Sequence, residues 1–117
     1  MDRLAREPRK GNMGSVIYND SVLYVDDATL AHLQYAIVQR YRRGESFLLT
    51  WTDDGSVDGR ERSLWLSPNA PLSFEFDAPG DVPLELVWVD ALNKTADATG
   101  GLRIVDRDGE PVAVTTR

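Results

Sequence analysis

The stretch LAHLQYAIVQRYRRGESFLLTW, residues 30–51, predicts a helix, a glycine stop and a strand. At helical spacing one continuous arc is apolar, formed by Leu30, Ala31, Leu33, Ile37, Val38 and Tyr41. The opposite side, which we expect to face solvent, carries His32, Gln39 and Arg43. Gly44 suits the end of the helix, because glycine readily adopts the left-handed conformation. We therefore expect a helix from about Ala28 to Arg43, followed by a strand over 47–51 whose alternate residues face inward.

Charged residues mark both ends of this helix. Asp26 or Asp27 can cap its start, since a carboxylate accepts hydrogen bonds from the free backbone N–H groups there. The last turn carries Arg40, Arg42 and Arg43, which can offset the negative end of the helix dipole. The same three side chains can also clamp a phosphate or a carboxylate. The first interpretation is the simpler one, because no second basic cluster lies nearby in the sequence.

The rest of the chain has the pattern of short strands and turns. Further strands are predicted over 15–18, 21–25, 62–67, 72–76, 102–105 and 112–114. Asn19-Asp20 predicts a hairpin between the first two, and Asp108-Gly109 predicts the tip of a final one. Tight connections among 47–51, 62–67 and 72–76 predict an antiparallel meander. We therefore expect an α+β fold with a small antiparallel sheet, in the order β-β-α-β-β-β-α-β and a possible last strand, and two helices packed on one face.

The second helix is predicted over residues 83–96, although LELVWV alone also fits a strand. One arc of the helix carries Leu84, Val87, Trp88, Ala91, Leu92 and Thr95. Pro83 suits a first turn, and Gly100-Gly101 provides a stop. Leu86 and Val89 fall off this arc. Apolar side chains of that size at a surface often meet a partner, so we expect these two residues to form a partner interface.

Composition bounds the classes of protein that the chain can belong to. Its 117 residues fit one domain, and the absence of cysteine removes disulfides and thiolate chemistry. The net charge is −6, yet residues 1–12 carry +2, so residues 13–117 carry −8. We expect 1–12 to be a flexible basic leader before a single domain over 13–117, whose acidic surface repels nucleic acid. No signal peptide or long apolar run is present, which predicts a cytoplasmic protein without a membrane partner.

Candidate chemistry is sparse. DGSVDG, residues 54–59, has the opening spacing of a calcium loop, but the twelfth position, which needs a glutamate, is Trp65. A small metal-dependent hydrolase built on the aspartates of 53–58 is therefore disfavoured. His32 is the single histidine, and its expected place on the polar side of a helix gives it no nucleophile or orienting carboxylate. We expect no catalytic residue, no metal site and no cofactor.

From Met13 to about residue 106, seven motifs recur in a known group of proteins: MGSVIY, DDATLAHLQ, YRRGESF, TWTDD, LWLSP, LVWVDAL and GGLRIV. In this combination the chain resembles a family of short uncharacterised actinobacterial proteins, often labelled ATP-dependent DNA ligase. Such ligases take up AMP on the lysine of a Lys-x-Asp-Gly motif, which neither Lys10 nor Lys94 matches. The resemblance therefore implies no active-site residues here. It implies that residues 1–12 are an extra leader, and it supports a helix over 83–96.

Two hypotheses for function follow from these features. The first is a non-catalytic cytoplasmic module for binding or assembly, which associates with itself or docks on a protein through Leu86 and Val89. The alternative is an accessory protein for nucleic acid or ligase-associated DNA repair, which uses Arg40, Arg42 and Arg43.

Overall fold

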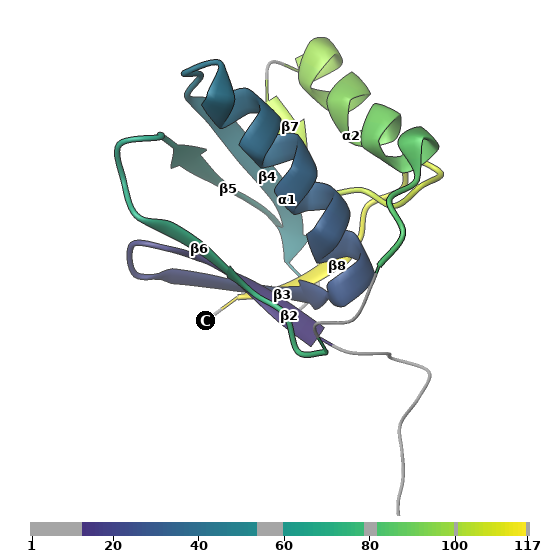
Figure 1. Ribbon diagram of the computed structural model, residues 1–117, viewed down its shortest axis with the longest axis horizontal. Coiled ribbons are helices and arrows are strands. Elements are labelled where there is room, and N and C mark those ends of the chain that lie inside the picture. The colour runs from purple at the N-terminus through teal and green to yellow at the C-terminus, as the bar shows by residue number, and fades with distance from the viewer. Residues whose placement is uncertain (1–12, 54–59, 79–81, 100, 117) are drawn as a thin grey trace, which may run out of the picture.

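The computed structural model describes residues 13–53, 60–78, 82–99 and 101–116 (Figure 1). Its elements are β2 (Met13–Tyr18), β3 (Ser21–Asp26), α1 (Asp27–Arg42), β4 (Phe47–Asp53), β5 (Glu61–Leu66), β6 (Leu72–Glu75), α2 (Leu86–Thr99), β7 (Gly101–Arg103) and β8 (Ala113–Thr116). Their order confirms the predicted α+β fold and the predicted order of strands and helices. In Figure 1 α1 crosses in front of the sheet and α2 lies beside it.

The sheet is mixed, so the expectation of a purely antiparallel sheet is wrong. The strands run in the order β5-β4-β8-β3-β2-β6, and β7 also pairs with β4. Strand β4 pairs antiparallel with β5 but parallel with both β7 and β8. The reason is the connection, because α2 lies between the early strands and β7 and returns the chain in the direction of β4.

The predicted meander holds only for β4 and β5. Strand β6 pairs with β2 on the far side of the sheet, with Val16 opposite Phe74. The segment between β5 and β6 contains Pro68 and Pro71, which have no N–H to donate to a strand ladder. The chain therefore leaves β5 without forming a tight hairpin and extends the β2–β3 hairpin instead.

The ends of the first hairpin and the first helix follow the sequence closely. Asn19 has a φ of 52° in the turn between β2 and β3, and Gly44 has a φ of 72° after α1. The Asp26 carboxylate caps α1 by accepting a hydrogen bond from the backbone N–H of Thr29 at 2.6 Å. Asp27 is buried, and its two carboxylate oxygens accept from the backbone N–H groups of residues 77 and 78. Asp26 therefore starts the helix, whereas Asp27 holds the segment after β6.

The predicted final hairpin is correct at its tip and wrong in its pairing. Gly109 has a φ of 84° in the turn, and Val105 and Pro111 form an isolated bridge. Beyond that bridge the two strands do not pair with each other. They lie in succession along one edge of β4, with β7 opposite 48–50 and β8 opposite 52–53.

One cluster of buried apolar side chains joins the two helices to the sheet. Its fully buried members include Leu30, Leu33, Ile37, Leu49, Leu66, Leu92 and Leu102. The alternation predicted for the strand at 47–51 is confirmed, since its three inward residues are all buried. Among the described helices, none is long and apolar enough to span a membrane.

Candidate functional site

His32 and Trp88 fix the position of α2 against α1. The His32 side chain is fully buried, and its ring stacks on Trp88 with centroids 4.1 Å apart and planes 15° from parallel. Its Nδ1 lies 2.7 Å from the carbonyl oxygen of Ala28, and its Nε2 accepts from the backbone N–H of Glu85 at 2.9 Å. These partners require the neutral ring with its proton on Nδ1. Both ring nitrogens are therefore engaged in structure.

The expectation that His32 faces solvent is wrong. Helical periodicity identifies the face of α1 that packs on the sheet, but α2 covers a second face of the same helix. The contact joins residues 53 positions apart, from His32 to Glu85. Nothing in the pattern of α1 itself indicates that cover.

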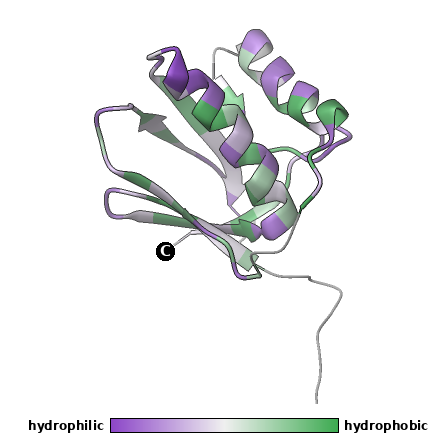
Figure 2. Cartoon of the chain, in the orientation of Figure 1, coloured by the Kyte–Doolittle hydropathy of each residue, from purple (hydrophilic) through white to green (hydrophobic). Residues whose placement is uncertain are grey.

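The first turn of α2 is hydrophobic, as its green colour in Figure 2 shows. Leu86 is 76% exposed and Val87 is 60% exposed, whereas Val89 is buried. The helix begins at Leu86, three residues after Pro83. Its buried face contains Val89, whereas Val87, which the sequence placed on that face, is exposed. The expected exposure of Leu86 is thus confirmed, and that of Val89 is wrong.

A groove of about 560 Å³ lies between the two helices. It is lined by Tyr35, Gln39, Arg40, Arg43 and Glu45 from α1 and the residues just after it, and by Leu86, Val89, Asn93 and Asp97 from α2. The structure therefore brings together residues from both sets that the sequence singled out. Arg42 does not line this groove.

Glu45 divides the predicted arginine cluster. Its carboxylate accepts from Arg43 Nε at 2.7 Å and from Arg40 Nη1 at 3.3 Å. The hydrogen bond from Arg43 lowers the pKa of Glu45 below its usual value, and the Glu45 carboxylate in turn raises the pKa of Arg43. Arg42 is exposed and forms no ion pair with any described residue.

Arg40 links the two helices. Its side chain is only 13% exposed, and its Nη2 donates to Asn93 Oδ1 of α2 at 3.3 Å. The guanidinium carbon also lies 5.6 Å from the centre of the Phe47 ring, within the range of a cation–π contact. The three arginines thus take different roles: Arg40 cross-links α1 to α2, Arg43 pairs with Glu45, and Arg42 faces solvent.

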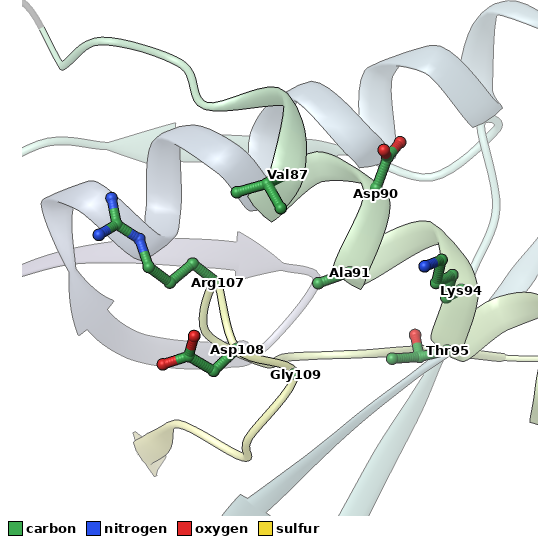
Figure 3. A pocket seen from close by; sticks show the side chains of 8 residues that line it. All are labelled: Val87, Asp90, Ala91, Lys94, Thr95, Arg107, Asp108 and Gly109. Carbon is green, nitrogen blue, oxygen red and sulfur yellow. The ribbon is translucent and has the colours of Figure 1, made fainter.

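A second hollow, of about 410 Å³, lies on the other side of α2 (Figure 3). The figure shows the turn residues Arg107, Asp108 and Gly109 facing Val87 and Ala91 of the helix. Arg107 also forms an ion pair with Glu85. The hollow therefore combines opposite charges with one exposed apolar side chain.

Three exposed apolar residues lie at the start of α2 or just before it, and we call them the α2 apolar patch: Leu84, Leu86 and Val87. Leu86 borders the groove with α1, and Val87 borders the hollow with the 107–109 turn. The sequence predicted exposed apolar residues here, but of the predicted pair only Leu86 is exposed, since Val89 is buried and Leu84 and Val87 are exposed instead.

The side chains that can bind a metal ion are scattered over the described part of the chain. No three described His, Asp or Glu side chains gather closely enough to hold a metal ion. The predicted ligands of the calcium loop, at 54–58, lie outside the described residues. Asp53, at the edge of that segment, accepts from Arg62 Nε at 2.8 Å.

Comparison with known proteins yields a family and no function. No curated protein and no solved structure matches the chain. One family model matches residues 13–107, most of the chain. The chain therefore belongs to the family defined by a domain of unknown function, DUF7882.

Proposed function

We propose that this protein is a non-catalytic cytoplasmic module for binding or assembly, which associates with itself or docks on another protein through α2. The observation that carries the proposal is the exposure of Leu86, 76% of which is open to solvent beside the groove between the helices. Burying a leucine side chain stabilises an interface by about 1.5–3 kcal/mol. An apolar patch with a polar rim is typical of a protein interface.

The rim of the groove suits a protein ligand. The charged residues Arg40, Arg43, Glu45 and Asp97 line the groove together with Tyr35 and Leu86. The carboxylate of Glu45, held between two guanidiniums, occupies the place that a carboxylate of a partner would take. Such a rim confers specificity, whereas Leu86 supplies apolar area.

Sedimentation equilibrium over a range of protein concentrations tests self-association. We expect the wild type to form a concentration-dependent dimer. Leu86→Glu should raise the Kd of the dimer about tenfold or more, since the interface would then bury a charge in place of a leucine side chain. Trp65→Glu is the matched control, because Trp65 is an exposed apolar residue as well, at 60%, but lies on β5. Unchanged circular dichroism and thermal unfolding would show that both variants fold.

If the wild type is strictly monomeric, the remaining form of the proposal is that the protein docks on another protein. Affinity purification from the native cell, with and without nuclease, would then recover a stoichiometric protein with the wild type and with Trp65→Glu, but not with Leu86→Glu. If Leu86→Glu changes neither association nor recovery, the proposal is wrong.

The nucleic-acid alternative fits the geometry less well. Glu45 neutralises charge on Arg40 and Arg43, which leaves Arg42 as the exposed cation of the three without an ion pair among the described residues. Recovery of repair or replication proteins that nuclease abolishes, together with salt-dependent DNA binding lost in Arg42→Glu, would favour this alternative.

A further inference from the structure

The indole of Trp51 is buried without a hydrogen-bond acceptor among the described residues. Trp51 is only 4% exposed, and its Nε1–H has no partner there. The indole of Trp88, by contrast, donates to the carbonyl oxygen of Val105 at 2.9 Å. Buried indoles normally find such an acceptor, because water no longer supplies one. Trp51 therefore offers a donor that the described fold does not use.

Trp51 also borders a cavity of about 300 Å³, where β3, β4, β5 and β8 meet. The polar part of its lining comes from Ser21, Trp51, Arg62, Ser63 and Thr116. No carboxylate is among the described residues that line it. The cavity is thus distinct from the groove beside α2, with which it shares no lining residue.

The lining presents hydrogen-bond donors. An indole and a guanidinium only donate, and hydroxyl groups can do so. Arg62 uses its Nε to bond Asp53 Oδ2 at 2.8 Å, which orients the guanidinium and leaves its two terminal nitrogens without a partner among the described residues. A ligand for this cavity must therefore supply acceptors, and a planar or tetrahedral oxyanion matches a guanidinium best.

We propose that this cavity is a binding site for a small oxyanion-bearing ligand, a carboxylate or a phosphate, held by Trp51 Nε1, Arg62 and the neighbouring hydroxyls. Its volume lies at the small end of the range for ligand sites, about 300–1,000 Å³, which limits the ligand to a small molecule. The site is independent of the proposed protein interface, so either proposal can fail alone.

Indole N–H signals provide a direct test, because the chain has three tryptophans in different settings. Sodium acetate and sodium phosphate are titrated separately into ¹⁵N-labelled protein at constant ionic strength, with sodium chloride as the reference. We expect one or both oxyanions to move the Trp51 Nε1–H signal downfield to saturation, as a new hydrogen bond does. The signals of Trp65 and Trp88 should stay in place. Whether acetate or phosphate moves the Trp51 signal shows whether the site prefers a carboxylate or a phosphate.

Matched arginine variants test the assignment. Arg62→Gln should raise the Kd for the oxyanion about tenfold or more, because the variant loses a charge-assisted hydrogen bond to it. Arg107→Gln removes the same charge beside the hollow of Figure 3 and should leave the Kd unchanged. Ser63→Ala, which keeps Arg62 and its ion pair, guards against a folding defect and should also weaken binding. A Trp51 signal that neither oxyanion moves, or that chloride moves equally, overturns the proposal.

Discussion

At the scale of single residues, Tyr41 has a buried hydroxyl whose effect on the free energy of unfolding can be measured. Its hydroxyl is buried without a described partner, and burial, with a smaller contribution from Tyr18, raises its pKa to about 12. Between pH 10 and 12 the unfolded chain loses this proton while the folded protein keeps it, so the unfolded state binds fewer protons. The stability that depends on neutral Tyr41 is therefore complete below about pH 10 and is lost as the pH rises toward 12.

Tyr41→Phe keeps the ring that packs edge-on against Phe47, with centroids 6.0 Å apart, and removes only the hydroxyl. We expect the free energy of unfolding at neutral pH to stay the same or to rise by up to about 1 kcal/mol, because an unsatisfied buried polar group disappears. Urea denaturation at neutral and alkaline pH should also show a weaker alkaline loss than in the wild type. A fall of more than about 1 kcal/mol at neutral pH would instead show that the hydroxyl has a favourable partner.

At the scale of elements, the contact between α1 and α2 depends on the hydrogen-bond acceptor that His32 provides and not only on packing. His32→Phe keeps an aromatic ring against Trp88 but leaves the backbone N–H of Glu85 without its acceptor. We expect a loss of about 1–3 kcal/mol in the free energy of unfolding. The amides at the start of α2 should exchange faster with solvent, while those of the β2–β3 hairpin keep their protection.

Tyr35→Phe is the control for that measurement, because Tyr35 lies on the same helix with its side chain partly exposed. Its removal of a hydroxyl should change the stability by no more than about 0.5 kcal/mol. If His32→Phe leaves both stability and exchange at the start of α2 unchanged, the hydrogen bond from Glu85 does not hold this helix in place.

The same elements show how far the sequence reaches. Local signals predicted the Asn19 turn and the Gly44 stop correctly and limited the cap of α1 to Asp26 or Asp27, of which Asp26 is the cap, because each feature depends on the conformation of a few consecutive residues. Periodicity failed for His32, because α2 covers a second face of α1 there, and for Val89, because the buried face of α2 includes Val89 in place of Val87. Strand partners failed similarly: the pairing of β6 with β2 joins distant parts of the chain.

At the scale of the whole molecule, the candidate site depends on contacts that no local pattern encodes. The groove joins residues near 40 to residues near 90, and it forms because α2 returns the chain to run β7 parallel to β4. The sequence singled out Arg40, Arg43 and Leu86, which line this groove. It did not indicate that Arg40 and Leu86 would meet in one groove while Arg42 would lie outside it.

The three tryptophans can report which surface of the whole molecule associates. Trp65 on β5 is 60% exposed, whereas Trp51 and Trp88 are buried, so Trp65→Phe should remove most of the quenching of tryptophan fluorescence by acrylamide.

Strand β5 is an edge of the sheet, and edge strands also associate by adding a strand from another chain. If copies join through the α2 apolar patch, quenching of Trp65 should stay constant as the protein concentration rises through the dimerisation range. Protection of Trp65 over that range, in Leu86→Glu as well as in the wild type, would place the contact at the β5 edge and exclude the α2 patch as the site of self-association.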